Sequence, residues 1–326
     1  MRVVAQKRFV DLKQPFRVAF GTIVGLDTVA VSIERGGAIG QGECCPMAIY
    51  GQTPDATLAE IAAIAPAIER GEIDRIALQH ALPARSARNA LDCAFWDLEA
   101  KASGRSVWDL AGLERPATII SDVTIGILSP EESYRVAACL DAPAMIKLKL
   151  GGEQDLDCLR AVRAARPDTP LFVDVNAGWT LAQLNERAPA LAEAGVFMIE
   201  QPLPPADDAL LDQYNRLVPL GADESCHDRS DLARLHGRYD YINIKLDKTG
   251  GLTEALALAE AARGQGFRLM VGCMLATGLA MAPAYMVASL CELVDLDAPL
   301  IVKHAAHAGV RHDGRLLHAF DADLWG

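Results

Sequence analysis

The amino-acid sequence predicts an α/β protein in which an N-terminal α+β unit precedes a parallel β/α barrel. Up to about residue 115, segments typical of strands are followed by helical segments. Beyond that point, eight short apolar runs alternate with Ala/Leu-rich helical segments, a pattern typical of a parallel sheet or barrel. A charged residue stands near the end of one apolar run after another, which is the third observation in favour of a barrel.

The N-terminal unit is expected to pair an antiparallel sheet with helices. Residues 8–46 contain strand-like runs joined by glycine-containing turns, for example at Arg35–Ala38. Residues 56–71 and 86–104 then show helical periodicity, and each segment ends on a glycine. The change of pattern at 112–116 divides the chain into predicted domains at 1–115 and 116–326.

The second domain supplies the eight predicted strands. They are the segments 119–126, 145–150, 171–176, 196–202, 219–225, 241–247, 268–274 and 291–297. A doubly wound open sheet is the structural alternative to a closed barrel. No G-x-G-x-x-G sequence follows the first strand, so a dinucleotide-binding fold lacks its fingerprint.

Composition limits the partners and the compartment. A net charge of −12 argues against a nucleic-acid partner, and the N-terminus has no apolar core of signal-peptide length. We therefore expect a cytoplasmic protein whose eight cysteines are free thiols, with a homo-oligomer left open. Residues 269–291 carry no charge, but Gly272, Gly278 and Pro283 interrupt them, which favours a buried strand, loop and helix over a membrane span.

Five charged residues recur at the interval of one strand plus one helix. Lys149, Asp174, Glu200, Asp223 and Lys245 are separated by 25, 26, 23 and 22 residues. In a β/α barrel, the C-terminal strand ends surround one mouth, so this spacing brings the five groups together. Each carboxylate could instead cap a helix or pair with a lysine, but three on consecutive strands favour a shared site.

The residue types suggest proton transfer beside a metal ion. Asp174, Glu200 and Asp223 offer hard oxygen ligands, which favour Mg²⁺. Lys149 and Lys245 flank these acids in the chain, and a lysine near a cation and another ammonium has a lowered pKa. Lys147 lies on the same strand face as Lys149 and supplies the second ammonium. Removal of a proton next to a carboxylate fits this set, with the metal stabilising the enediolate.

This pattern resembles the muconate lactonizing subgroup of the enolase superfamily. K-x-K, then Asp, Glu, Asp and a final Lys on successive strands carry the resemblance, which covers nearly the whole chain. The resemblance implies a (β/α)7β TIM-like barrel with an N-terminal α+β capping domain that holds the specificity loops. It also implies that the C-terminal tail returns to the capping domain.

Within this subgroup, the stretch "VDLDAP" is similar to the D-x-D motif of dipeptide epimerases. There the two aspartates, here Asp295 and Asp297, bind the free α-ammonium of the dipeptide. The strings "ARNALDCAFWDL", "ADESCHDRS", "NIKLDKTGGLTEALALA" and "GCMLATG" are similar to bacterial epimerases of the L-Ala-D/L-Glu type. The implied activity is a Mg²⁺-dependent inversion of the C-terminal residue of a dipeptide, with Lys149 and Lys245 as catalytic bases supported by Lys147.

Specificity is expected to depend on the capping-domain loops. Glutamate-handling members usually carry an arginine in the first loop, and alignment on the Pro-Phe pair places Phe20 there; Arg17 is expected to face elsewhere. Phe20 and Tyr50 are therefore candidate substrate-binding residues, and an uncharged side chain in the dipeptide becomes an alternative to glutamate. The other activities left open are a lyase or cycloisomerase of the same subgroup, which has little use for Asp295 and Asp297, and an N-acyl amino acid racemase.

Overall fold

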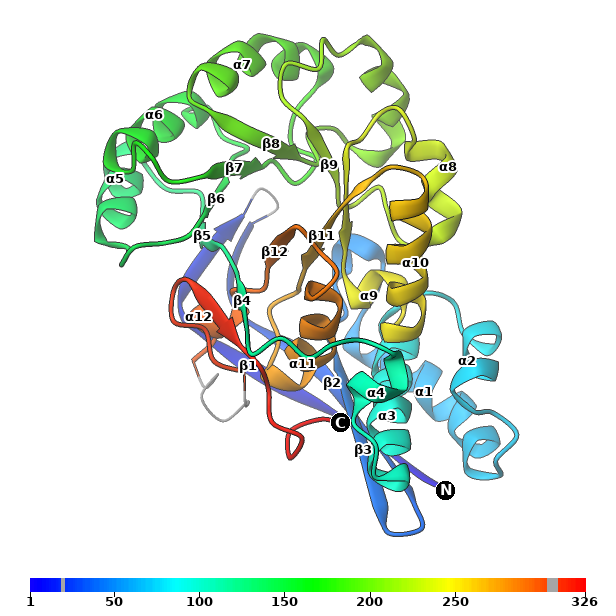
Figure 1. The fold of residues 1–326 in the computed structure, drawn as a ribbon. Coiled ribbons are helices and arrows are strands. Elements are labelled where there is room, and N and C mark those ends of the chain that lie inside the picture. The colour runs from blue at the N-terminus through cyan, green and yellow to red at the C-terminus, as the bar shows by residue number, and fades with distance from the viewer. Residues whose placement is uncertain (19–20, 304–309) are drawn as a thin grey trace.

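The fold class predicted from the sequence is confirmed by the computed structural model, which describes residues 1–18, 21–303 and 310–326 (Figure 1). Eight strands pair in one parallel sheet, and a separate three-stranded antiparallel sheet begins the chain. The exact limits of the two domains, at residues 115 and 116, stay a prediction.

The N-terminal unit pairs its antiparallel sheet with helices. Its strands are β1 (Arg2–Val18), β2 (Gly21–Arg35) and β3 (Ala38–Cys44). The remaining elements of this unit are η1 (Ala48–Tyr50), α1 (Pro54–Glu69), α2 (Arg75–Ala81), α3 (Ser86–Ser103) and α4 (Val107–Ala111). Helix α3 lies so close to β3 that a Cβ at Gly42 would collide with the carbonyl oxygen of Ala90, so this position needs glycine.

The eight parallel strands form the barrel. They are β5 (Val123–Ile125), β6 (Ile146–Lys149), β7 (Leu171–Asp174), β8 (Val196–Glu200), β9 (Leu220–Ala222), β10 (Tyr241–Ile244), β11 (Arg268–Gly272) and β12 (Leu293–Asp295). The first and last strands meet where the Asp122 N–H donates to the Val294 carbonyl oxygen at 3.1 Å. Large apolar side chains such as Phe172, Met198 and Met270 cluster with one another, which accounts for the apolar residues that make up most of these strands.

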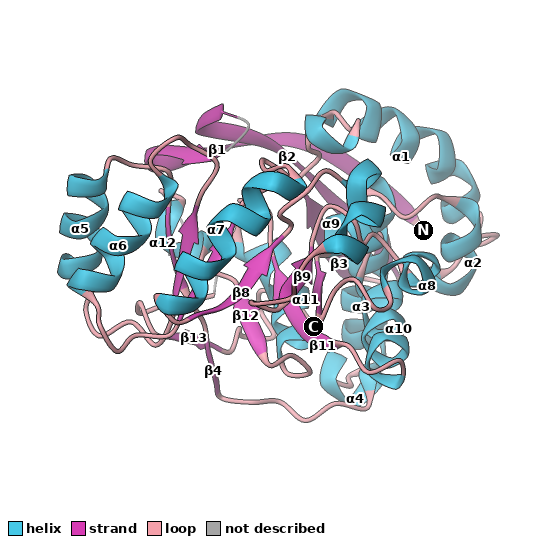
Figure 2. Cartoon of the chain, turned by 90° about the horizontal axis from the view of Figure 1, so that it is seen from above, coloured by secondary structure: helices cyan, strands magenta, loops and turns pink. Residues whose placement is uncertain are grey.

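Helices and 3₁₀ turns link the strands and surround them (Figure 2). They are α5 (Pro130–Cys139), α6 (Asp155–Ala165), α7 (Leu181–Glu193), η2 (Pro205–Gln213), η3 (Arg229–Asp231), α8 (Leu232–Leu235), α9 (Leu246–Thr249), α10 (Leu252–Gly264), α11 (Gly278–Ala288) and α12 (Ala298–Ile301). The uncharged segment 269–291 is a strand, a loop and the fully buried helix α11, as predicted. Among the described residues, no helix has the length and apolar character needed to cross a bilayer. All eight cysteines are free.

One predicted strand, 119–126, is in fact two. Only β5 enters the barrel, whereas β4 (Thr118–Ile120) pairs antiparallel with β13 (Leu316–His318). The break falls at Ser121 and Asp122. The partner of β4 lies almost 200 residues further along the chain, so local periodicity could not reveal the split. Beyond β13, the Trp325 indole donates to the Cys93 carbonyl oxygen at 3.0 Å, which brings the C-terminal segment against α3.

The far end of the β1–β2 hairpin lies over the barrel. Two backbone hydrogen bonds hold it there: the Ile127 N–H donates to the Arg17 carbonyl oxygen at 3.0 Å, and the Lys303 N–H donates to that of Asp11 at 2.9 Å. Figure 2 shows both long strands running across one side of the molecule. The hairpin thereby covers the end of the barrel at which the charged residues collect.

Candidate active site

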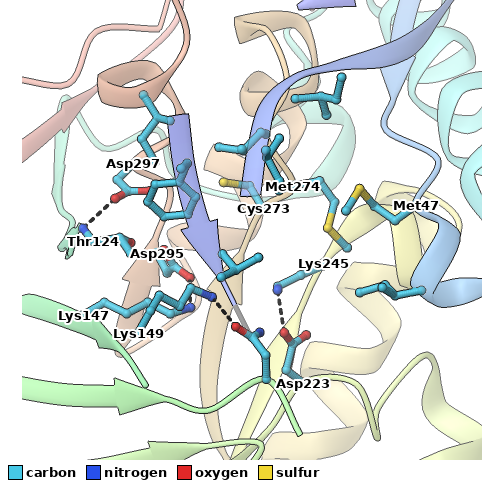
Figure 3. Close-up of a pocket in the computed structure, with 18 of the residues that line it drawn as sticks. Met47, Thr124, Lys147, Lys149, Asp223, Lys245, Cys273, Met274, Asp295 and Asp297 are labelled. Atoms are coloured by element: carbon cyan, nitrogen blue, oxygen red, sulfur yellow. Dashed lines mark hydrogen bonds and ion pairs between the residues drawn. The ribbon is translucent and has the colours of Figure 1, made fainter. Parts of the chain in front are cut away.

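A pocket of about 370 Å³ lies between the hairpin and the C-terminal ends of the barrel strands. This volume is within the range of small-molecule sites. The barrel side of the pocket, called the floor below, carries the ionisable groups Lys147, Lys149, Asp223, Glu224, Lys245, Asp295 and Asp297. The hairpin side, called the roof, carries the apolar groups Phe16, Val18, Ile23, Val24 and Leu26. Figure 3 shows how the floor residues converge.

The three acids predicted as metal ligands come together at adjacent strand ends. Asp174 and Glu200 are the last residues of β7 and β8 and stand side by side in the sheet register. Asp223 directly follows β9. All three are fully buried, and we call them the acid triad. The regular spacing in the sequence thus produced the expected convergence.

The predicted lysines reach the same acids from different strands. Lys149 Nζ lies 2.5 Å from Asp174 Oδ2, and Lys245 Nζ lies 2.6 Å from Asp223 Oδ2. Figure 3 shows Lys149 and Lys245 entering the pocket from opposite sides. Lys147 is buried beneath them, 2.8 Å from Glu200 and 2.6 Å from Asp295. The two candidate bases are therefore separated by the acid triad in space as well as in sequence.

These pairings set the ionisation of the site. Burial opposes the ionisation of Asp174 and Asp223, but the neighbouring lysines outweigh it and hold both pKa values below the ordinary value. Burial and the charge of Asp174 raise the pKa of Glu200 to about 7. Burial lowers the pKa of Lys245, but Asp223 more than compensates and raises it well above the ordinary value. The sequence predicted a lowered lysine pKa, but the pKa of Lys245 is raised while Lys245 is paired with Asp223.

Sequence reasoning missed several buried or half-buried polar partners of the site. Lys248 Nζ donates to the Asp223 carboxylate at 2.6 Å, and Asn243 Nδ2 donates to Glu200 Oε1 at 2.6 Å. Asn176 accepts a hydrogen bond from Lys149 at 3.0 Å. Burial and the nearby Asp223 raise the pKa of Glu224 to about 8. The available signal was spacing: Lys248 is three residues after Lys245, one helical turn away, and Asn176 is two after Asp174.

At the other end of the floor, Asp295 and Asp297 already have partners. Lys147 pairs with Asp295, and the Thr124 N–H donates to Asp297 Oδ2 at 2.7 Å. Burial and the charge of Asp295 raise the pKa of Asp297 to about 6. A third acid that the sequence did not single out, Asp122, lies beside them. One oxygen from each of Asp122, Asp295 and Asp297 lies within 4.8 Å of the other two, and we call these residues the aspartate cluster.

The acid triad has the donor chemistry that a magnesium site needs. Among the described residues, the aspartate cluster is the set of three acids with oxygens within 4.8 Å of one another. The acid triad is not such a set, because lysines pair with its oxygens. Glu200 Oε2 is buried and ion-paired with Lys147 Nζ at 2.8 Å, and it accepts no hydrogen bond within the described chain. A buried, all-carboxylate set with an acceptor oxygen that accepts no hydrogen bond fits a hard divalent cation.

The two candidate specificity residues have different outcomes. Tyr50 lines the pocket and packs edge-on against His227, with ring centroids 5.4 Å apart. Phe20 lies outside the described residues. Arg17 is exposed and lines a neighbouring cavity of about 580 Å³ instead of the pocket, in agreement with the sequence-based expectation.

Comparison with protein families accounts for both parts of the chain. Residues 1–112 match the N-terminal domain of the mandelate racemase / muconate lactonizing enzyme family, and residues 134–316 match the enolase C-terminal domain-like family. The chain belongs to the enolase superfamily. Its barrel and its N-terminal unit are both accounted for by this membership.

Curated relatives cover most of this chain. It is 44% identical to the L-Ala-D/L-Glu epimerase of Escherichia coli over 88% of its length and 90% of that protein. It is 42% identical to an N-acetyl-D-glutamate racemase of Pseudoalteromonas over 76% of its length and 79% of that protein. It is 35% identical to a hydrophobic dipeptide epimerase of Roseobacter litoralis over 92% of its length and 91% of that protein.

Solved structures extend the similarity to the fold. An enolase family member from Agrobacterium tumefaciens with homology to dipeptide epimerases, bound to sodium and L-Ala-L-Glu, matches with a TM-score of 0.96 and 39% identity over 99% of both chains. A dipeptide epimerase from Enterococcus faecalis, in complex with Mg and L-Leu-L-Tyr, matches with a TM-score of 0.88 and 29% identity over 98% of this chain and 97% of that one.

Proposed function

We propose that this chain is a magnesium-dependent dipeptide epimerase that inverts the α-carbon of the C-terminal residue of a dipeptide. The observation that carries the proposal is the pair of lysines that enter one pocket from opposite sides of the acid triad. The epimerases among the relatives support the same reaction.

The opposed lysines are suited to a two-base inversion. One lysine, as the neutral amine, takes the α-proton from one face of the substrate and becomes an ammonium. The other lysine, already an ammonium, gives a proton to the opposite face and becomes the amine. No atom is gained or lost overall, and the α-carbon is inverted. Lys149 and Lys245 each serve one face, and buried Lys147 keeps a positive charge next to Lys149.

Asp174, Glu200 and Asp223 would hold the magnesium ion. When bound, Mg²⁺ supplies Lewis-acid stabilisation for the negative charge that develops on the substrate carboxylate and lowers the pKa of nearby lysines. Asn243 holds one oxygen of Glu200 in place by its hydrogen bond, and Lys248 does the same for Asp223.

Asp295 and Asp297 would bind the free ammonium at the other end of the dipeptide. Both line the pocket, and Lys147 balances only one of their two charges. A substrate ammonium would balance the second. An N-acylated amino acid has no such cation, which favours a dipeptide over the N-acyl substrate of the Pseudoalteromonas relative.

The roof favours an uncharged side chain on the epimerised residue. Its side chains are apolar, and Met47, Ile49 and Tyr50 continue the apolar surface. Among the described lining residues, the cations are three lysines, each paired with a carboxylate. A glutamate side chain against this surface would be desolvated without a partner, whereas a hydrophobic one would gain burial. We therefore propose that L-Ala linked to a hydrophobic residue is turned over at least as well as L-Ala-L-Glu.

Deuterium uptake at the α-carbon, followed by mass spectrometry in heavy water, tests the proposal. A panel of free dipeptides is compared with the N-acetylated form of each. Free dipeptides should exchange and epimerise, and acetylation should remove most of the activity, because losing one partner of a desolvated charge pair costs roughly 2–5 kcal/mol. Equal rates on both forms would favour an N-acyl amino acid racemase instead.

A further inference from the structure

Asp122 is a buried acid without a partner beside the ammonium end of the pocket. Its side chain is fully buried, and neither carboxylate oxygen has a hydrogen-bond partner among residues 1–18, 21–303 and 310–326. Its backbone is fixed where the barrel closes, since its N–H donates to Val294 and His312 Nε2 lies 3.2 Å from its carbonyl oxygen. The side chain is therefore held within 4.8 Å of the oxygens of Asp295 and Asp297.

The three acids of the aspartate cluster repel one another when ionised, so each ionised carboxylate needs a nearby cation or hydrogen-bond donor. Asp295 is balanced by Lys147, and Asp297 accepts a backbone N–H from Thr124. Asp122 has neither, so it is the acid for which ionisation is least favourable. Burial, followed by the charges of Asp295 and Asp297, raises the pKa of Asp122 well above its ordinary value, and Lys147 opposes this only in part.

We propose that Asp122 is a positioning residue that keeps its proton and donates a hydrogen bond to a carboxylate oxygen of Asp295 or Asp297. A protonated carboxyl group has one O–H donor, and carboxylate oxygens of both neighbours lie within 4.8 Å of it as acceptors. The terminal torsion of aspartate is soft, so a small rotation brings the groups into line. The hydrogen bond fixes how the two aspartates face the substrate ammonium. This role rests on the proposed function.

Infrared spectroscopy tests the proton directly and needs no turnover. The protein is isotopically labelled at its aspartate carboxyl carbons, which separates them from Glu200 and Glu224. At neutral pH the wild-type spectrum should contain the carbonyl band of a protonated aspartic acid, and that band should be missing from Asp122→Asn. A wild-type spectrum in which the band is absent, or in which Asp122→Asn leaves it unchanged, would overturn the proposal.

Kinetics test the positioning role with two substrates. L-Ala-L-Leu carries the ammonium, and propanoyl-L-Leu has a hydrogen in its place. Asp122→Leu removes the donor, and its KM for L-Ala-L-Leu should rise about tenfold while kcat and the KM for propanoyl-L-Leu change less than about twofold, as for one lost hydrogen bond to a charged group. Asp122→Asn keeps an N–H donor and should restore most of the KM.

The control is Asp92→Asn, which changes a buried aspartate that does not line the pocket. It should leave the ratio of the two KM values unchanged. An equal rise in KM for both substrates in Asp122→Leu would mean that Asp122 does not act through the ammonium site, which would overturn the positioning role. If the wild type exchanges no free dipeptide, the proposed function fails, and the infrared result still decides the protonation of Asp122.

Discussion

The floor and the roof enclose the same pocket but are built in different ways. Every charged floor residue is held by at least one hydrogen bond or ion pair, and several, such as Lys147 and Asp223, have three or more. The roof residues line the pocket with apolar surface, and Val24 is 65% exposed. A substitution in the floor therefore leaves a buried charge unpaired, whereas one in the roof changes apolar surface that faces a ligand or packs against neighbouring apolar side chains.

This difference separates the reaction from the choice of substrate. The floor comes from the strand ends of the barrel, where the sheet fixes the backbone that carries these side chains. The roof comes from a hairpin of the N-terminal unit. We expect floor substitutions to change the rate by orders of magnitude for every substrate, and roof substitutions to change the ranking of substrates.

Removal of the metal should have the largest effect. Chelation should abolish epimerisation of every dipeptide, and added Mg²⁺ should restore it. Glu200→Gln should reduce bound metal and lower kcat/KM at least about a hundredfold, because one charged ligand is lost. Metal analysis and turnover are measured together, with Glu292→Gln, at an exposed ion pair, as the matched control. Full activity in excess chelator would contradict the assignment of the acid triad.

Replacing either base should come next. Lys149→Ala and Lys245→Ala should each lower epimerisation by about 10²–10⁴, the usual contribution of a general acid or base. Because each lysine serves one face, each variant should still exchange the α-proton of one epimer in heavy water, and the two variants should favour opposite epimers. A variant that epimerises at the wild-type rate shows that its lysine is not a base.

A change in the roof should alter specificity and not chemistry. Ile23 is half-buried in the roof and pairs with Phe16 in the hairpin. Ile23→Arg places a cation there, so kcat/KM for L-Ala-L-Glu relative to L-Ala-L-Leu should rise about tenfold, or about 1.4 kcal/mol in discrimination. Val4→Arg, at an exposed position on β1 outside the pocket, is the control. A wild-type enzyme that already prefers L-Ala-L-Glu tenfold would contradict the claim that the apolar roof disfavours a charged side chain.

The smallest effect on turnover is expected where helix α3 of the N-terminal unit contacts helix α10 of the barrel. Asp92 in α3 accepts a hydrogen bond from the Thr253 N–H of α10, and burial raises its pKa to about 6 from 3.8. The folded state binds this proton more tightly than the unfolded chain, so the contribution to stability is complete below pH 3.8 and is lost as the pH rises through about 6.

Asp92→Asn should remove this dependence. The free energy of unfolding of the wild type should lose about 1–3 kcal/mol more between pH 4 and 6 than that of the variant. Denaturant titrations at several pH values measure the two slopes. Parallel slopes would mean that Asp92 titrates normally in the folded protein, while kcat/KM at neutral pH should change little in either case.

The sequence revealed those parts of the site that repeat with the fold. Lys149, Asp174, Glu200, Asp223 and Lys245 recur once per β/α unit, so their convergence could be deduced from spacing. Asn243 and Lys248 escaped notice because their roles depend on which carboxylate they face, which is a three-dimensional fact. Asp122 was hidden for another reason. It lies at a break inside an apolar run, and before this break β4 pairs with the distant β13 instead of entering the barrel.

Part of the attachment of the hairpin to the barrel uses atoms that do not depend on residue type, proline N–H excepted. The hydrogen bonds from Ile127 to Arg17 and from Lys303 to Asp11 join backbone N–H and carbonyl groups, while the Lys13 side chain donates to the Pro299 and Leu300 carbonyl oxygens. Mutations in the roof therefore leave these hydrogen bonds intact. Substrate specificity can therefore change by single substitutions in the roof while the fold and the catalytic residues are kept, which is the physical basis of evolvability at this site.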